Sequence, residues 1–214
     1  RSSNKCYSGG EILMKLFLNT VKSSVGQIIL FAIIPFIWWF VTARNKQSFF
    51  KWLGLKKFEG KRKIVTDIFI ISILFTIVGA FLLYSVRNIG TATSKFDGLG
   101  VKAIPAITIH ALFNTSFPEE LLFRGYLLKR LSNIVGFNWA NLIQAILFGF
   151  LHGVMFFAVV GILKTFLICL FTSAIAWFMG YINEKEANGS IIPSWIIHAI
   201  ANLFSGIYAA FSII

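Results

Sequence analysis

The sequence predicts an all-α protein, a polytopic membrane helical bundle with about six transmembrane helices and a break near Pro118. Three observations lead to this fold class. Apolar residues make up 57% of the 214 residues, and charged residues only 13%. The mean hydropathy is +0.79. Thirty large aromatic side chains, 24 phenylalanines and 6 tryptophans, stand against only 8 carboxylates. This composition excludes a soluble enzyme, a disordered chain and a disulfide scaffold.

A membrane-spanning helix needs about 20 apolar residues. Pro118 lies inside one such stretch, and we expect a broken helix there because proline lacks a backbone donor and clashes with the preceding turn. Non-helical backbone at membrane depth is tolerated only where it packs on protein or lines a cavity. We expect one membrane domain over residues 1–214, in which residues 1–23 form an N-terminal extension whose first ten residues need not be native. The predicted spans are 24–43, 64–86, 103–131, 138–158, 159–182 and 191–212.

Much of the formal charge of +12 lies in one loop. Residues 44–63 join the first two apolar runs and hold eight basic residues against one acid, Glu59. The positive-inside bias places such a loop in the cytoplasm, where it also meets anionic lipid headgroups. We expect no nucleic acid partner, because no polar groove with stacking aromatics accompanies the charge. The two cysteines, Cys6 and Cys169, predict neither a disulfide framework nor a metal spacing.

Two adjacent carboxylates lie in an otherwise apolar segment, where each ionisable group needs a partner or a purpose. Glu120 and Arg124 are four residues apart and can form an ion pair on one helical face. Glu119 points about 100° away and has no basic partner at helical spacing. It is therefore the free carboxylate and a candidate general base. The alternative is that both acids only stabilise a helix start at headgroup level.

Two histidines in other apolar segments favour the catalytic interpretation. His152 follows Phe148 by one helical turn, and Asn202 follows His198 by one turn. A single histidine in a membrane helix more often only packs. A glutamate and two histidines on three segments, in a chain with few intramembrane polar groups, predict a shared cavity. If they converge, Glu119 is the base, His152 shares the water, and His198 and Asn202 are donors to a developing oxyanion.

The same groups also allow a zinc site. Glu119, His152 and His198 could bind zinc and leave one position open for water. We disfavour zinc and expect no cofactor, because Arg124 and Asn202 suit a metal-free oxyanion arrangement and no close-spaced ligand pair is present. Other intramembrane hydrolase signatures are missing from the sequence: it contains no HExxH, no GxSG and no presenilin-like aspartyl pattern.

Three motifs occur in order, each on its own apolar segment: Pro118-Glu119-Glu120-x-x-x-Arg124, Phe148-x-x-x-His152 and His198-x-x-x-Asn202. Together they resemble the signature of the CAAX protease and bacteriocin-processing family, also called the Abi family. The resemblance implies an all-helical intramembrane endopeptidase with a catalytic core at 103–212 and a cavity accessible from the cytoplasm. By this resemblance Glu119 and His152 activate the water, and His198 with Asn202 forms the oxyanion site. Glu120, Arg124 and Phe148 have supporting positions.

Members of this family trim prenylated proteins, cut peptide pheromones or bacteriocin leaders, or confer bacteriocin immunity. The Lys/Ile/Phe-rich composition resembles that of a low-GC Gram-positive bacterium. It favours a bacterial cell-membrane protein that processes a membrane-associated peptide, or acts in immunity, over one that trims prenylated substrates. The alternative of another class is a non-catalytic immunity or transport protein, since transporters also place acids and broken helices at the membrane midplane.

Overall fold

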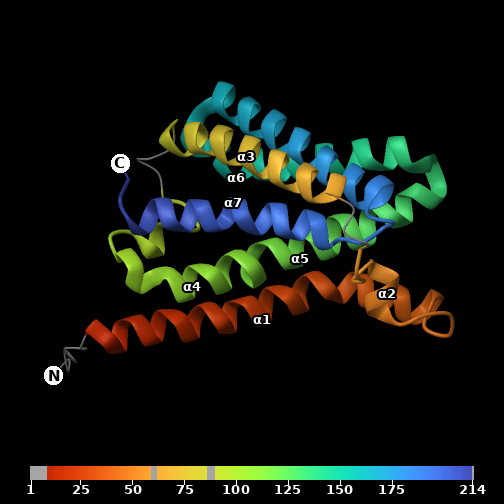
Figure 1. Cartoon of the computed structure of the whole chain (residues 1–214), viewed down its shortest axis with the longest axis horizontal. Helices are drawn as coiled ribbons and strands as arrows, with labels where there is room; N and C mark the ends of the chain where they lie inside the picture. Colours follow the sequence, from red (N-terminus) through yellow and green to blue (C-terminus); the bar gives the residue numbers. More distant parts are fainter. Residues whose placement is uncertain (1–8, 59–61, 86–89, 214) are drawn as a thin grey trace.

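The computed structural model describes residues 9–58, 62–85 and 90–213, so Cys6 and Glu59 lie outside the described residues. Every regular element within these ranges is helical, which confirms the predicted all-α class (Figure 1). The elements are α1 (Gly9–Thr42), α2 (Phe49–Leu53), α3 (Arg62–Ser85), η1 (Ser94–Phe96), η2 (Gly100–Ala103), α4 (Ile104–Ile109), η3 (His110–Ser116), α5 (Phe117–Glu120), η4 (Leu121–Leu128), α6 (Lys129–Tyr181), η5 (Ile182–Glu186) and α7 (Ile192–Ala210).

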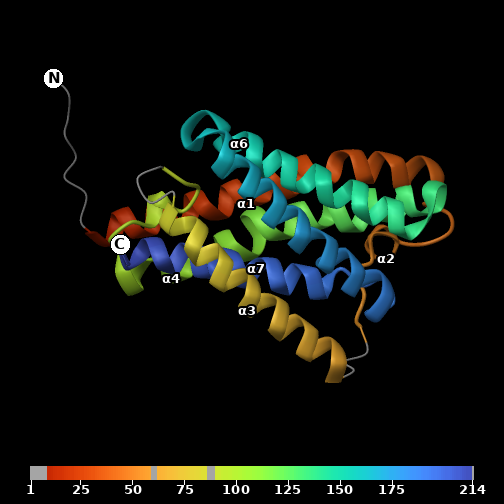
Figure 2. The same cartoon turned by 90° about the horizontal axis from the view of Figure 1, so that it is seen from above.

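Long apolar helices confirm a multi-pass membrane protein. Two glycines with positive φ, Gly136 at 77° and Gly161 at 76°, interrupt the longest helical stretch. They lie close to the boundaries predicted before 138 and near 159, and Figure 2 shows α6 turning back on itself. The number of crossings, about six, stays a prediction. By length and composition, four helical stretches in the described ranges can cross a membrane: Gly9–Thr42, Arg62–Tyr84, Gly100–Glu186 and Ile192–Ala210.

Helix α1 begins earlier than the predicted first span of 24–43. The residues from Gly9 to 23, assigned from the sequence to an N-terminal extension, continue the same helix. Two hydroxyl groups on this part of α1 are buried with a hydrogen-bond partner: the Thr20 hydroxyl donates to the Leu16 carbonyl at 2.9 Å, and the Ser24 hydroxyl donates to the Thr20 carbonyl at 2.8 Å. In Figure 1, α1 runs alongside α4 and α5.

The chain stays helical through Pro118. Segments η3 and η4, on either side of α5, are π-helical, and the Phe117 N–H donates to the carbonyl of Leu112, five residues back. Proline lacks a donor and crowds the preceding turn, and a wider turn accommodates both effects. The predicted break near Pro118 therefore takes the form of two widened segments and not of an interrupted helix.

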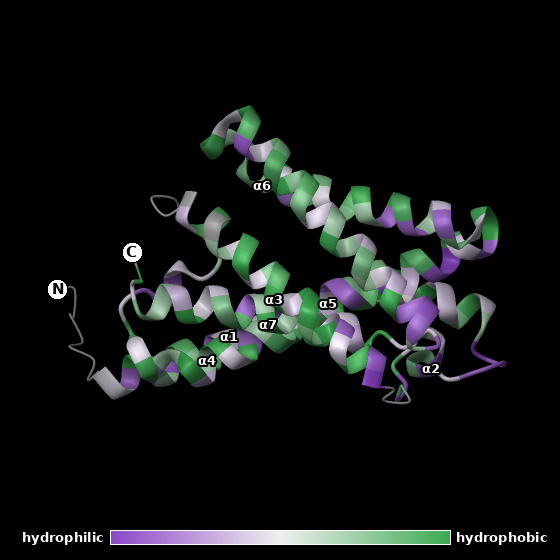
Figure 3. Cartoon of the chain, turned by 45° about the horizontal axis from the view of Figure 1, so that its top comes forward, coloured by the Kyte–Doolittle hydropathy of each residue, from purple (hydrophilic) through white to green (hydrophobic). Residues whose placement is uncertain are grey.

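Several polar side chains are buried inside the bundle, while many large apolar side chains are exposed on its outside. Val41, Ile77 and Ile162 are exposed outward on α1, α3 and α6, as lipid-facing side chains are expected to be. Figure 3 shows hydrophobic residues along the helices, and hydrophilic residues gathered near α2. The fully buried polar side chains in the described ranges are Ser116, Glu120, Arg124, Asn141, Gln144, Asn183, Ser190 and Ser194. Most of them lie on the helices that carry the predicted site.

Candidate active site

Three residues from three helices meet at one carboxylate oxygen. Glu119 lies on α5, His152 on α6 and His198 on α7. Oε2 of Glu119 is 3.9 Å from Nε2 of His152 and 3.8 Å from Nε2 of His198. That oxygen is buried and has no hydrogen-bond partner among the described residues. The convergence predicted for these three side chains is therefore present, and Glu119 forms no ion pair with a lysine or arginine of the described residues.

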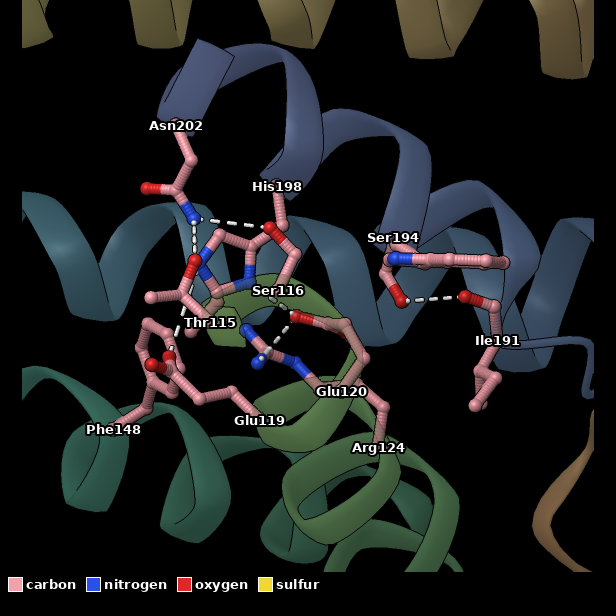
Figure 4. Close-up of polar contacts among 12 residues, drawn as sticks. Thr115, Ser116, Glu119, Glu120, Arg124, Phe148, Ile191, Ser194, His198 and Asn202 are labelled. Carbon is pink, nitrogen blue, oxygen red and sulfur yellow. Dashed lines mark hydrogen bonds and ion pairs between the residues drawn. The ribbon is translucent and has the colours of Figure 1, made fainter. Parts of the chain in front are cut away.

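Glu120 serves a different purpose from its neighbour. It forms the predicted ion pair with Arg124, whose Nη1 donates to Oε1 at 2.9 Å, and both side chains are fully buried. The same Oε1 lies 2.9 Å from Nδ1 of His198 (Figure 4). A carboxylate paired with arginine only accepts hydrogen bonds, so Nδ1 of His198 is the donor. Glu120 thus fixes the orientation of His198 and turns its Nε2 toward Glu119.

His152 is oriented by the backbone and the ring of one residue, Phe148. Its Nδ1 lies 2.9 Å from the Phe148 carbonyl, which can only accept, so Nε2 is again the atom that faces Glu119. The Phe148 ring centroid is 4.3 Å from the His152 ring and 5.9 Å from the His198 ring. The guanidinium of Arg124 lies 4.3 Å from the same centroid. Phe148 therefore contacts both imidazoles and the supporting cation.

Two polar side chains fix the part of α6 that carries His152, between Gly136 and Gly161, against the part that follows Gly161. The Asn141 amide donates to the Trp177 carbonyl at 3.0 Å, and the Gln144 amide donates to the Ala176 carbonyl at 3.1 Å. Both bonds join the two antiparallel parts of α6 within the bundle. Because both amides are fully buried, these bonds replace contacts with water that the membrane interior cannot supply.

The start of α7 is anchored one turn before His198. Asn183 forms two bonds with Ser194: its amide donates to the hydroxyl at 2.7 Å, and its oxygen accepts from the backbone N–H at 3.2 Å. The Trp195 indole donates to the Leu112 carbonyl at 2.9 Å, which ties α7 to the π-helical segment η3. These contacts set the rotation of α7 and with it the direction of His198.

Asn202 lies one turn after His198 on α7, and its side chain contacts two hydroxyl groups. Its amide nitrogen donates to the Thr115 hydroxyl at 2.7 Å and to the Ser116 hydroxyl at 3.0 Å (Figure 4). Sequence reasoning did not select Thr115 and Ser116. A signal was available, because Thr115 precedes Glu119 by four residues and so shares a helical face with it.

The third histidine is not part of this site. His110 lies at the start of η3, where its Nδ1 is 3.2 Å from the Lys95 ammonium and its ring packs edge-on against Phe96. Where the chain is described, no group of three or more His, Cys, Asp or Glu side chains is arranged to hold a metal ion.

Fold and site together define a helical, multi-pass membrane protein with an acid–imidazole centre inside the bundle. Residues 101–204 match the family model described as type II CAAX prenyl endopeptidase Rce1-like. This segment contains all eight named residues of the three motifs, and the match confirms the resemblance that they predicted. The family implies a peptidase acting on a peptide or protein substrate in a membrane. No curated protein and no solved structure matches the chain.

Proposed function

We propose that the protein is a glutamic-type intramembrane endopeptidase. One observation carries the proposal: the buried Oε2 of Glu119 lies between the Nε2 atoms of His152 and His198, at 3.9 and 3.8 Å. Both imidazoles use Nδ1 as a donor elsewhere, so the Nε2 atoms of both rings face the same small region beside Glu119. Such a region suits a water molecule that must lose a proton.

Oε2 of Glu119 and Nε2 of His152 are the acceptors that would activate the water for hydrolysis. A water donates one hydrogen to Oε2 of Glu119 and the other to Nε2 of His152, which leaves an oxygen lone pair for the scissile carbonyl carbon. Glu119 takes the proton as the carbon–oxygen bond forms, and the carbonyl oxygen becomes an oxyanion. Glu119 then passes the proton to the amide nitrogen as the carbon–nitrogen bond breaks. The carbonyl re-forms as the amine leaves, and the second water hydrogen then passes from the new carboxylic acid to the amine, so the products are a carboxylate and a protonated amine.

His198 and Asn202 form the proposed oxyanion site. Glu120 accepts the Nδ1–H of His198 and so directs Nε2 toward the reacting carbonyl, much as the aspartate of a serine-protease triad orients its histidine. Asn202 contributes its amide from the next turn of α7, so the developing negative charge meets the fixed dipole of that amide.

The substrate class proposed is a membrane-associated peptide or protein. A pheromone or bacteriocin precursor is favoured over a prenylated CAAX-type protein, because the composition resembles that of a bacterial chain. The positive-inside bias favours a cytoplasmic position for the cationic loop 44–63 and the adjoining end of the bundle. The proposal therefore has the scissile bond enter from the cytoplasmic side of the cell membrane.

The test compares the peptides of cells that carry the wild type, Glu119→Gln or Glu186→Gln. Glu186 is an acid in η5 that pairs with Lys63, and it serves as a matched control. Mass spectrometry of membrane and secreted fractions should show products with the wild type and the control. The Glu119→Gln cells should accumulate the uncut precursor. Identical peptide pools, together with full biological effect of the variant, would instead favour the immunity or transport function.

Zinc is the alternative candidate, because one carboxylate and two imidazoles are ligands that it takes, although the three side chains are not arranged as a ligand group in the described structure. In that case Glu119, His152 and His198 would hold the metal, which would supply Lewis-acid activation of a water. A chelator separates the two proposals. Activity that survives a strong chelator, in protein without stoichiometric metal by elemental analysis, supports the glutamic type. Activity lost on chelation and restored by zinc supports the metal-dependent type.

A further inference from the structure

A polar cavity lies away from the acid–imidazole centre, next to α2. Its volume is about 280 Å³, which is small for a drug-sized ligand and suits one compact polar group. Its walls come from three parts of the chain, namely α2 with the loop after it, the start of α6, and the turn between η5 and α7. The lining residues are Lys51, Trp52, Gly54, Lys56, Lys129, Glu184, Asn188 and Gly189.

The walls of this cavity are held together by specific contacts. The Ile191 N–H donates to the Gly54 carbonyl at 3.0 Å, and the Ser190 hydroxyl donates to the Lys56 carbonyl at 2.6 Å. Gly54 has a φ of 89°, and a Cβ on it would lie 2.3 Å from the Gly189 carbonyl oxygen. Only glycine allows this close approach of the two loops. The cavity is thus a built feature and not a gap between mobile side chains.

Within the part of the chain that the structure describes, two lysines in the lining form no ion pair. Lys129 donates to Glu184 and to the Gly189 carbonyl, so its charge is neutralised. Lys51 and Lys56 have no carboxylate within ion-pair distance among the described residues. Three lysines against one glutamate give the lining an excess of two positive charges. An anion is the ligand that complements it.

The cavity also lies where headgroups are expected. The Trp52 ring in its wall is covered by the guanidinium of Arg130 at 4.0 Å. Trp39, at the adjoining end of α1, donates to the Gln47 carbonyl at 2.9 Å. Tryptophans beside arginine and lysine mark the membrane–water interface, and basic pockets between helices on the cytoplasmic side bind lipid head groups. We infer that this cavity binds a phosphate group, supplied by an anionic phospholipid headgroup or by free phosphate.

The experiment measures the unfolding temperature of purified protein in lipid-free detergent. Phosphatidylglycerol should raise this temperature by about 5 °C near saturation, and phosphatidylcholine should not. The double variant Lys51→Gln/Lys56→Gln should lose more than half of that increase. The double variant Lys46→Gln/Lys57→Gln removes the same charge from the same loop outside the cavity and should keep the increase.

Inorganic phosphate distinguishes the two sources of the ligand. If inorganic phosphate without phospholipid stabilises the wild type but not Lys51→Gln/Lys56→Gln, the cavity is a site for the free ion. If phosphatidylglycerol stabilises the wild type and inorganic phosphate does not, the occupant is a lipid headgroup. Equal responses of the two double variants, or no response of the wild type to either ligand, would overturn the inference.

Discussion

Glu120 and His198 are joined by a buried hydrogen bond of 2.9 Å between Oε1 and Nδ1. The same oxygen accepts from Arg124, so a cation, an anion and an imidazole form one continuous chain in the bundle interior. Glu119, the adjacent residue, takes no part in that chain and faces the two Nε2 atoms. Two neighbouring glutamates therefore have separate tasks, one in orienting a histidine and one available for chemistry.

The first prediction separates these tasks by equal substitutions. Glu120→Gln leaves Arg124 buried without its counter-charge, and we expect the unfolding temperature to fall by about 10 °C or more. Glu119→Gln should leave that temperature within about 2 °C, because its Oε2 accepts no hydrogen bond from the described residues. It should abolish peptide cleavage. Thermal unfolding and cleavage assays on both variants check this, and similar stability of the two variants would contradict it.

The second prediction concerns the histidines. His152→Ala should reduce turnover by about 100-fold or more, because the attacking water loses an acceptor. His110→Gln should keep turnover within a few-fold of the wild type, since that residue contacts Lys95 and Phe96 and not Glu119. Cleavage rates of both variants, measured on protein of verified folding, provide the check. A comparable loss in the two variants would mean that the effect on turnover is not specific to the site.

The third prediction concerns the hydroxyl groups that hold Asn202. Asn202→Ala should lower kcat roughly 100-fold, the scale of one oxyanion donor. Thr115→Val keeps the side-chain shape but removes an acceptor of the Asn202 amide, so kcat should fall roughly tenfold with little change in KM. Thr108→Val is the control, because the Thr108 hydroxyl donates to the Ile104 carbonyl of its own helix. If kcat is equal in the two valine variants, Thr115 does not position Asn202.

The fourth prediction tests the junction between the two loops. Gly54→Ala should lower the unfolding temperature by about 5 °C, because the new Cβ meets the Gly189 carbonyl and φ is positive. Gly26→Ala, in α1, should cause no such loss, since a Cβ there has no atom within 4 Å. Thermal unfolding of both variants in one detergent is the measurement. An unaffected Gly54→Ala variant would show that the two loops can separate without cost.

Much of the site could be predicted because its key spacings are helical. Glu120 with Arg124, and Phe148 with His152, are pairs four residues apart, and such pairs meet on any helix whatever the tertiary fold. The apolar lengths also located the end of α1 and the turns at Gly136 and Gly161 to within a few residues, but not the start of α1 at Gly9. The single-domain organisation, the orientation in the membrane and the roles of the site residues stay predictions.

Other features depend on tertiary contacts that no local pattern encodes. The tautomer of His198 is set by Glu120, which is 78 residues away in the sequence. Asn202 reaches Thr115 and Ser116 across 87 and 86 residues. The widened turns beside Pro118 were also missed, because proline in a sequence predicts a helix break and does not indicate whether neighbouring helices will sustain a π-helical alternative.

The acid–imidazole centre has two halves that differ in access. The side chains of Glu120 and Arg124 are 0% exposed and that of His198 is 7%, whereas Glu119 and His152 are 21% and 25% exposed. Substitutions around the buried half, beside Glu120 and Arg124, will be limited by the loss of folding stability. Residues around the exposed half, beside Glu119 and His152, can be varied with less loss of stability. Laboratory evolution of a new cleavage preference should therefore begin on the open side.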